Sequence, residues 1–266
     1  QIGKAFRNEI VARNFIFRIR EFEQMEIEYF FNPQEKWEPI FMDWLERQEK
    51  FFYALGLKKE DIRLFEHPKE KLSHYSRKTV DIEYNFPFGW GELSGLAHRG
   101  DFDLTQHSKF SNTKLEYLDP VSGEKFVPHV IEPTFGLDRT ILVALLAAYH
   151  EEKVEGEERV VMKFPLAIAP IKIAIFPLLK NKPQLVDKAK EIYNLLKQQY
   201  TCEFDDNGNI GKRYRRQDEI GTPFCITVDF DSLENNDVTI RDRDTMKQER
   251  IKIDELKEYF EGRFNK

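Results

Sequence analysis

The sequence predicts an α/β protein in two parts, and two observations indicate this. From Gln1 to about Tyr149, strand patterns surround helical patterns, which is typical of an α+β domain with an antiparallel sheet. From about Arg159 to Lys266, strand and helix patterns alternate, which indicates an α/β unit with a mixed sheet. A chain of 266 residues can hold two such domains. We therefore expect one domain over residues 1–155 and a second over residues 156–266.

The first part contains two clear strand patterns and one clear helix. Side chains alternate from Phe17 to Tyr29 and again from Thr79 to Phe86, which is the two-residue period of a strand. Apolar residues recur every three or four positions from Pro39 to Leu55, which predicts a helix that Gly56 ends. The charged segment from Lys58 to Lys71 is expected to be connective.

The two parts meet after an apolar run, Ile141–Tyr149, which has the length of a core helix. The acidic segment that follows, His150–Glu158, is expected to be a linker. The second part is predicted to continue with a buried strand, an amphipathic helix, a further strand, a hairpin and a last helix capped by Asp254. The first four of these elements are expected at Ile171–Phe176, Pro183–Gln198, Pro223–Phe230 and the pair Asp237–Asp242 and Gln248–Ile253.

Composition excludes several classes of protein. No stretch approaches the roughly 18 apolar residues that a membrane span requires, so we expect no membrane partner. Only Cys202 and Cys225 occur, without a Cys-x-x-Cys spacing, so reduced thiols and a cytoplasmic location are expected and zinc is not. The net charge of −6 argues against a protein that coats nucleic acid with its whole surface. It is compatible with a local basic patch.

One face of the predicted strand Phe17–Tyr29 carries a distinctive set of side chains. Two guanidinium groups suit phosphate oxygens, a phenyl ring can stack on a base, and a carboxylate can pair with an ammonium group. This combination suits a nucleoside triphosphate that lies beside an amine. An exposed strand with a solvated charged face would give the same spacing, so the pattern alone leaves both readings open. The residues that share the face are Arg18, Arg20, Phe22, Gln24 and Glu26.

Recognisable motifs flank this strand. Phe6-Arg7-Asn8-Glu9 precedes it, Arg18-Ile19-Arg20-Glu21-Phe22 lies in it, and Glu132-Pro133-Thr134-Phe135-Gly136-Leu137-Asp138-Arg139 comes later, directly before an apolar helix. The first two segments resemble the halves of motif 2 of the class II aminoacyl-tRNA synthetases, and the third resembles their motif 3. The ordered pair of motifs, followed by an α/β tail, is a specific signature of that class.

Within the class, the sequence most resembles the homodimeric glycyl-tRNA synthetases. The similar segments are Phe22–Glu26, Trp90–Gly95 with Asp101–Asp103, Asn209–Phe224 and Thr239–Met246, and the resemblance covers essentially the whole chain. It implies a class II catalytic domain followed by an anticodon-binding domain. It also implies a glycine–tRNA ligase, which activates glycine with ATP to glycyl-adenylate and transfers the glycyl group to tRNA(Gly). Because motif 1 of the family precedes motif 2, we expect this chain to be the C-terminal portion of a longer, homodimeric protein.

The resemblance implies a role for several residues in binding ATP with Mg²⁺. Arg7 should bridge the α-phosphate and the attacking carboxylate, Arg18 should meet the γ-phosphate, and Phe22 should stack on adenine. Arg139, at the start of a helix, should hold the γ-phosphate from the other side. Glu92 resembles the acidic residue that binds the magnesium ion. The complete expected ATP set is Arg7, Asn8, Glu9, Phe17, Arg18, Ile19, Arg20, Glu21, Phe22, Glu92, Leu93, Gly136, Leu137, Asp138 and Arg139.

Glycine offers only its two ends for recognition, so its pocket must exclude side chains. Glu26 is the main candidate for the substrate ammonium group, and Glu132 and Thr134 come next. Glycyl enzymes typically have serine where this chain has Thr134, which keeps the hydroxyl group and adds a methyl group that crowds the pocket. The complete expected glycine set is Phe22, Glu23, Gln24, Met25, Glu26, Glu132, Pro133, Thr134, Phe135 and Gly136.

A basic run in the second part is a candidate for tRNA binding. Cationic side chains that bind phosphates and an aromatic ring that stacks on a base are the expected chemistry for an unpaired anticodon loop. From the pattern alone, a solvated basic turn is the alternative, and the resemblance favours the tRNA site. The candidates are Lys212, Arg213, Tyr214, Arg215 and Arg216.

Two further hypotheses compete with a synthetase activity. One is a non-catalytic, synthetase-like accessory protein that binds tRNA or DNA; such relatives lose motif arginines, whereas Arg7, Arg18 and Arg139 are all present here. The other concerns the piece itself, which we expect to bind ATP or tRNA weakly and to be inactive without the upstream region.

Overall fold

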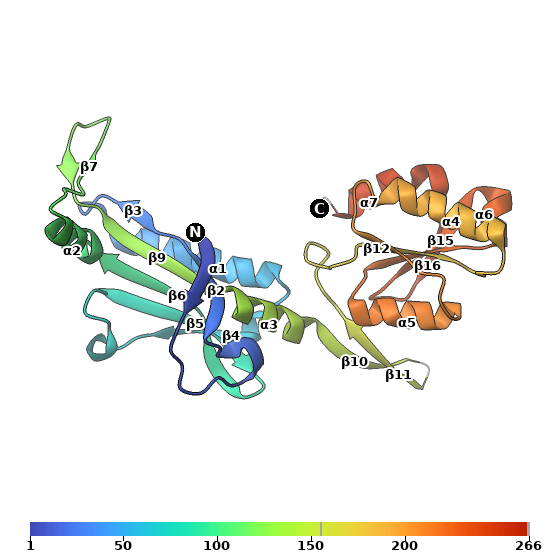
Figure 1. Cartoon of the computed structure of the whole chain (residues 1–266), viewed down its shortest axis with the longest axis horizontal. Coiled ribbons are helices and arrows are strands. Elements are labelled where there is room, and N and C mark those ends of the chain that lie inside the picture. The colour runs from blue at the N-terminus through green and yellow to red at the C-terminus, as the bar shows by residue number, and fades with distance from the viewer. Residues whose placement is uncertain (155, 265–266) are drawn as a thin grey trace. The chain divides into compact units, whose positions relative to one another are not determined.

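The computed structural model describes residues 1–154 and 156–264, and they form two compact units, Gln1–Ala144 and Leu145–Lys266. Each unit is described by itself below, and Figure 1 shows the course of the chain. Glu155, which ends the first predicted domain, and residues 265–266, which end the second, lie outside the described residues. The predicted domain boundary at 155/156 therefore stays a prediction.

The first unit is organised around a seven-stranded sheet in which every pair of neighbours is antiparallel. The strand order is β1-β2-β9-β6-β5-β4, and β3 pairs with β9 beyond the end of β2. The strands are β1 (Ile2–Phe6), β2 (Glu21–Glu26), β3 (Tyr29–Phe31), β4 (Ile62–Glu66), β5 (Lys78–Phe86), β6 (Gly89–Gly100) and β9 (His129–Gly136).

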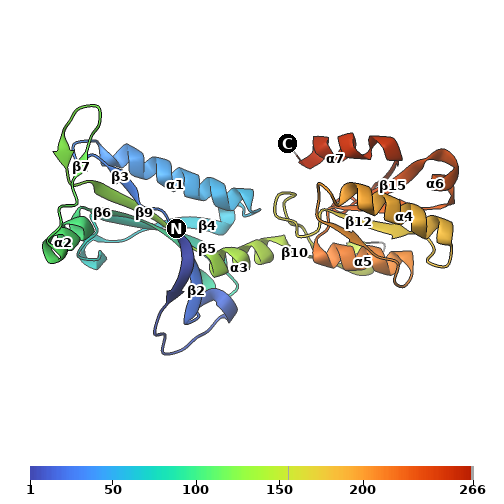
Figure 2. The same cartoon turned by 45° about the horizontal axis from the view of Figure 1, so that its top comes forward.

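One face of this sheet packs on helix α1, Trp37–Ala54 (Figure 2). The apolar stripe that predicted the helix is the side that is buried, with Phe41 and Phe52 at 1% and 0% exposure. Gly56 follows with a φ of 98°, a left-handed conformation that ends the helix, as predicted. Side chains of β5 and β9 alternate between full burial against α1 and partial burial on the other face. The other face is therefore available for a binding site.

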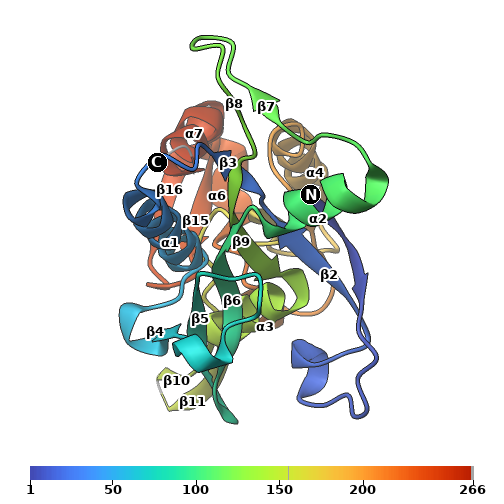
Figure 3. The ribbon, with the colours of Figure 1, turned by 90° about the vertical axis from the view of Figure 1, so that its left-hand side faces the viewer.

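Smaller elements complete the first unit. They are α2 (Phe102–Ser111), the hairpin strands β7 (Tyr117–Leu118) and β8 (Lys125–Phe126), and α3 (Leu137–Ala148), which starts directly after β9. Short 3₁₀ turns lie at Phe15–Phe17, Lys59–Asp61 and Lys69–Lys71. Figure 3 shows the long connection between β1 and β2, which extends beyond the sheet.

The second unit has a mixed five-stranded sheet in the order β13-β12-β14-β15-β16, with the first three strands parallel and the last two antiparallel. Helices α4 and α7 pack on one face and α5 on the other (Figure 1). The strands are β12 (Ile173–Pro177), β13 (Cys202–Phe204), β14 (Phe224–Val228), β15 (Asp237–Asp242) and β16 (Gln248–Lys252). The helices are α4 (Pro183–Leu196), α5 (Ile210–Ile220), α6 (Phe230–Asn235) and α7 (Leu256–Phe264). The predicted fold class is confirmed.

The described residues of the segment predicted as a linker, His150–Glu158, lie instead in or between the paired strands β10 (Tyr149–Val154) and β11 (Glu157–Met162). Charged residues of this strand pair form ion pairs that the sequence did not predict. Arg159 is 1% exposed and its guanidinium donates to Glu152 on β10 and to Asp218 on α5. Because these charges are paired, an acidic sequence could form an ordered strand pair.

The predicted strand Phe17–Tyr29 is also wrong at both ends. Phe17 closes a 3₁₀ turn, and the strand pairing with β9 covers only Gln24–Glu26 and then Tyr29–Phe31. Positive φ angles at Asn14 and Phe15 turn the chain before β2 begins. Arg18 and Arg20 therefore lie in the connection that leads into β2, not in the strand.

Two smaller predictions are also wrong. The segment Lys58–Lys71, expected to be connective, contains the edge strand β4. Asp254 lies inside a 3₁₀ turn, Ile253–Glu255, and its carboxylate accepts a hydrogen bond from Asn236 rather than capping α7.

Candidate active site

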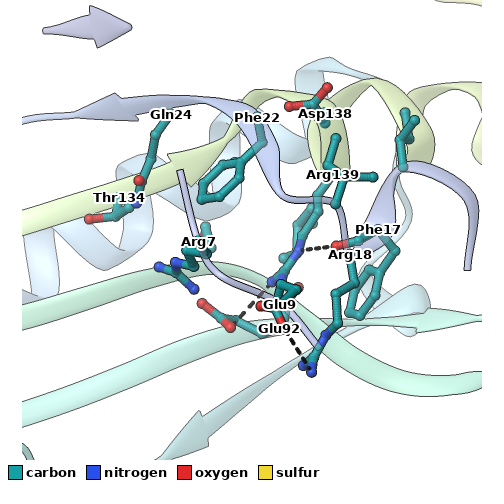
Figure 4. Close-up of a pocket in the computed structure, with 15 residues that line it drawn as sticks. Arg7, Glu9, Phe17, Arg18, Phe22, Gln24, Glu92, Thr134, Asp138 and Arg139 are labelled. Atoms are coloured by element: carbon teal, nitrogen blue, oxygen red, sulfur yellow. Dashed lines mark hydrogen bonds and ion pairs between the residues drawn. The ribbon is translucent and has the colours of Figure 1, made fainter. Parts of the chain in front are cut away.

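A pocket of about 560 Å³, open to solvent, lies on the face of the first sheet opposite α1. The connection between β1 and β2, the strands β2, β6 and β9, and the first turn of α3 all contribute to it (Figure 4). Its lining is Arg7, Glu9, Ile16, Phe17, Arg18, Ile19, Phe22, Gln24, Glu92, Leu93, Ser94, Thr134, Gly136, Asp138 and Arg139. Segments more than one hundred residues apart thus meet in one site.

Strand β2 forms one wall of the pocket because of its alternation. Phe22 and Gln24 point to the pocket side, whereas Glu23 and Met25 point to the opposite side. The register with β9 sets Gln24 opposite Gly136 and Glu26 opposite Thr134. The backbone N–H of Glu23 donates to the Asp138 carboxylate at 2.9 Å, which fastens β2 to the first turn of α3.

Arg139 is held firmly at the inner end of the pocket. Its Nε donates to the backbone carbonyl of Phe17 at 3.1 Å, and one terminal nitrogen donates to the carbonyl of Glu92 at 2.7 Å. The same nitrogen lies 3.2 Å from the Glu92 carboxylate. The side chain is 19% exposed, so a cation faces the pocket from a fixed position beside the N-terminus of α3.

Two more arginines face the same space (Figure 4). Arg18 lies 3.6 Å from the Glu9 carboxylate, and its buried Nε has no hydrogen-bond partner among the described residues. Arg7 lies 5.4 Å from the centre of the Phe22 ring and forms no ion pair within the described part of the chain. Three guanidinium groups that share one pocket, of which Arg7 and Arg18 have few partners among the described residues, are suited to a polyanion such as a triphosphate.

The carboxylate predicted for the substrate amine, Glu26, lies beside Thr134 at the end of this wall. Near it, Glu132 is ion-paired with Arg99 at 2.6 Å, and Arg99 also binds Asp103 at 2.8 Å. Burial raises the pKa of Glu132, and the Arg99 guanidinium opposes that rise. These acidic groups form a negative region adjacent to the cationic pocket.

Glu28 extends the negative region. Burial and the neighbouring Glu132 raise the pKa of Glu28 to about 7. At neutral pH its carboxyl group is therefore only partly ionised, which limits the repulsion within the group.

The pocket lining includes most of the expected ATP residues and some of the expected glycine residues. It does not include Asn8, Arg20, Glu21 and Leu137 of the first set, or Glu23, Met25, Glu26, Glu132, Pro133 and Phe135 of the second. Arg20 instead donates to the carbonyl of Glu9 at 3.0 Å. Pro133 and Phe135 are buried, and Phe135 packs on Phe51 and Phe52 of α1.

Sequence reasoning missed two lining residues, Ile16 and Ser94. Ile16 is apolar and carries no chemical signal. Ser94 lies two residues beyond Glu92 in the segment already singled out. The only sequence signal for Ser94 was its position close to Glu92.

In the second unit, the five tRNA candidates all lie on helix α5, but they are not equivalent. Arg213 is 1% exposed, and its guanidinium donates to four backbone carbonyls, of Pro177, Asp206, Asn207 and Gly208. The Tyr214 hydroxyl bonds to Thr227 at 2.6 Å, and its ring packs edge to face on Phe176. Both side chains therefore contribute to the fold.

The other three candidates are more accessible. Lys212 is exposed and Arg215 makes only long contacts, 3.6 Å to Glu157 and 3.7 Å to Asp218. Arg216 is ion-paired with Asp205. Lys212 and Arg215 line a groove together with Lys247 and Gln248 of the β15–β16 turn. This groove is the part of α5 that presents cations to solvent.

Two classes of site are absent from the described residues. No group of three or more His, Cys, Asp or Glu side chains in residues 1–154 and 156–264 is arranged to hold a metal ion. None of the helices described here is long and apolar enough to cross a membrane.

Comparison with known families matches both units. Residues 1–148 match the family of tRNA synthetase class II core domains (G, H, P, S and T), and residues 172–263 match the anticodon-binding domain family. The chain therefore belongs to the class II tRNA synthetase core family, with an anticodon-binding domain behind the core.

The curated relatives are similar over nearly the whole of this chain. Three of them are glycine–tRNA ligases: that of Acetivibrio thermocellus is 56% identical over 100% of this chain, that of Caldanaerobacter subterraneus 55% over 98%, and that of Thermobifida fusca 52% over 99%. The chain spans only 56–58% of the length of these three relatives. The resemblance to glycyl-tRNA synthetases is confirmed.

Proposed function

We propose that this chain is part of a glycine–tRNA ligase, which couples ATP cleavage to the charging of tRNA(Gly) with glycine. The observation that carries the proposal is the pocket lined by Arg7, Arg18, Arg139, Phe22 and Thr134, with Glu26 paired opposite Thr134 beside it. The similarity to glycine–tRNA ligases supports it. We also propose residues 1–155 as the catalytic part and residues 156–266 as the anticodon-binding domain.

In the first reaction step, the glycine carboxylate attacks the α-phosphorus of ATP and pyrophosphate leaves. The step builds negative charge, so fixed cations contribute most to the rate. Arg7 is proposed to bridge the two reactants, Arg18 and Arg139 to hold the γ-phosphate, and Phe22 to stack on adenine. Glu92, a half-exposed carboxylate that lies beside Arg139, would supply one oxygen ligand to a magnesium ion, and the ion would neutralise phosphate charge.

Selection of glycine is proposed to depend on the polar row at the end of the pocket. The carboxylates of Glu26 and Glu132 would attract the ammonium group, and the Thr134 hydroxyl would hydrogen-bond to it. Thr134 and Glu26 lie directly opposite each other, so a larger amino acid would meet the threonine methyl group. The negative region would also keep the amine apart from the phosphates.

For the second unit we propose recognition of the anticodon of tRNA(Gly) by the groove beside α5. The match to anticodon-binding domains supports this. We further propose that the complete enzyme is a cytoplasmic homodimer, and that this chain alone is inactive because it spans little more than half of its relatives.

The test is ATP–pyrophosphate exchange with each amino acid, on this chain and on the full-length protein that contains it. We expect exchange with glycine alone, in the full-length protein. Arg139→Ala in the full-length protein should reduce the rate at least about 100-fold, as loss of one oxyanion donor does. Arg47→Ala is the matched control, because Arg47 is an exposed arginine on α1 that pairs only with Asp43.

Exchange with alanine or proline but not with glycine would reject the substrate assignment. Tight tRNA binding without any exchange in the full-length protein would favour the accessory-protein alternative. Normal exchange by Arg139→Ala would reject the phosphate-binding role.

A further inference from the structure

The guanidinium group of Arg139 lies over the ring of Phe17, a residue of the expected ATP set that lines the pocket. The centre of its guanidinium group is 4.3 Å from the centroid of the Phe17 ring. The backbone carbonyl of the same residue accepts the hydrogen bond from Arg139 Nε at 3.1 Å. Phe17 thus contacts the arginine through both its ring and its main chain.

Phe17 is itself braced by the β5–β6 turn. Its ring meets Phe86 and Phe88 edge to face, each with a centroid distance of 4.9 Å. Those two rings stack on each other at 5.0 Å with an interplanar angle of 5°. At Gly91, an added Cβ would lie 3.0 Å from the Phe17 ring, so a side chain at this position would crowd the ring. The three rings form an aromatic bracket, Phe17–Phe86–Phe88.

The contacts leave a defined part of Arg139 free. The Phe17 ring contacts the guanidinium group, while the Phe17 carbonyl and Glu92 accept hydrogen bonds from Nε and one terminal nitrogen. The second terminal nitrogen has no partner among the described residues. Figure 4 shows Arg139 against the Phe17 and Glu92 sides of the pocket. That nitrogen therefore remains for a ligand.

We infer that Phe17, held by the aromatic bracket, is a positioning residue that fixes Arg139 for a terminal phosphate before the nucleotide binds. The inference rests on the proposed function, which gives Arg139 its phosphate. An arginine already in its binding geometry loses little side-chain entropy when the anion arrives. A cation stacked on a ring in a partly dehydrated site is attracted to that ring more strongly than at an exposed site. Removal of the ring should therefore weaken triphosphate binding without touching the ligand.

The test is equilibrium titration of the chain with the fluorescent nucleotide MANT-ATP, followed by displacement with unlabelled ATP and AMP. Phe17→Leu should weaken ATP about tenfold and leave AMP within about twofold, because AMP has no terminal phosphate for Arg139. Phe15→Leu is the matched control: it is the same substitution in the same 3₁₀ turn, at a ring that is 76% exposed.

A double-mutant comparison separates positioning from general disruption. If Phe17 acts through Arg139, Phe17→Leu should cost nothing further in an Arg139→Ala background. Phe88→Leu, which loosens the bracket without touching Arg139, should give a smaller loss in the same direction and covers the case in which Phe17→Leu does not fold. Circular dichroism identifies a misfolded variant.

The possible results are distinct. If the wild-type chain binds MANT-ATP and neither Phe17→Leu nor Phe88→Leu changes the ratio of ATP to AMP affinity, the inference is overturned and the proposed function stands. An equal loss for ATP and AMP also overturns it, because it indicates a structural effect. No binding of MANT-ATP by the wild-type chain overturns the inference, because Arg139 is then not held ready for a phosphate in this chain; the proposed function is tested separately by exchange in the full-length protein.

Discussion

At the scale of single residues, burial decides whether a charged or titratable side chain belongs to a site or to the fold. His98 is fully buried beside His129, with a distance of 5.5 Å between ring centroids, and Phe31 and Trp37 pack around it. Its Nδ1 accepts from the backbone N–H of Gly100 at 3.1 Å. Burial, with help from the nearby Arg77, lowers the pKa of His98 to about 4.

This buried histidine predicts a pH dependence of stability. The pKa of His98 in the unfolded chain is the ordinary 6.5, so below that pH the unfolded state takes up a proton that the folded state refuses. The free energy of unfolding should fall as the pH drops from 6.5 towards 4, by up to about 3 kcal/mol from this residue. Urea unfolding of the wild type and of His98→Leu between pH 7.5 and 4.5 checks this. The variant should show the shallower decline, and parallel curves would contradict the assignment.

At the scale of elements, the sequence predicted the helices that carry an apolar stripe and failed on those that do not. Helices α1 and α4 bury apolar residues at helical spacing, and both were predicted within a few residues. Helix α5 buries Arg213, Gln217 and Asp218 instead, so no apolar period marked it. The strand pair β10–β11 escaped prediction for the same reason, since its key buried group is Arg159.

The site was predictable to the extent that its chemistry is local to a motif. Arg7, Arg18 and Arg139 were identified from short patterns, and all three line the pocket. Arg20 was misplaced because β2 starts at Glu21, where it pairs with Phe6 of β1, and no local pattern encodes that pairing. The contact of Phe17 with Arg139 joins residues 122 positions apart, so only the folded structure reveals it.

The end of α5 gives a prediction on backbone conformation. Gly221 has a φ of 89°, and a Cβ added there would lie 2.6 Å from the Phe164 ring and 2.7 Å from the Met162 carbonyl. Gly221→Ala should therefore combine left-handed strain with overpacking and lower the free energy of unfolding by about 3 kcal/mol. Gly208→Ala is the control, because Gly208 also has a positive φ, 75°, but no atom within 4 Å of the added Cβ. We expect about 1 kcal/mol there. Equal losses in denaturant unfolding would argue against the steric term.

At the scale of the whole molecule, the net charge is negative, whereas one groove carries several cations. The chain carries a charge of −6, yet α5 presents Lys212 and Arg215 to a groove that also contains Lys247. A nucleic acid would be repelled by most of the surface and attracted at this patch. Binding through so few cations should be sensitive to salt and confined to one face.

Charge reversal tests this arrangement. The double variant Lys212→Glu and Arg215→Glu should weaken binding of a tRNA(Gly) transcript by more than about tenfold and reduce the slope of log affinity against log salt by about 1.5. Lys188→Glu, on α4 and on the other face of the sheet, should change neither quantity appreciably. Fluorescence anisotropy at several salt concentrations measures both. An unchanged slope in the double variant would show that RNA binds elsewhere.

The alternation along β2 has a consequence for how this protein can vary in length. An extra residue inserted between Asn8 and Phe15 falls in the connection beyond the sheet, where the chain can accommodate it. The same insertion between Phe22 and Glu26 would move every later side chain to the other face of the strand. If the extra residue followed Phe22 directly, Gln24 and Glu26 would point away from the pocket even though β2 still paired with β9. Natural relatives should therefore differ in length in the connection and keep a constant count of residues in β2.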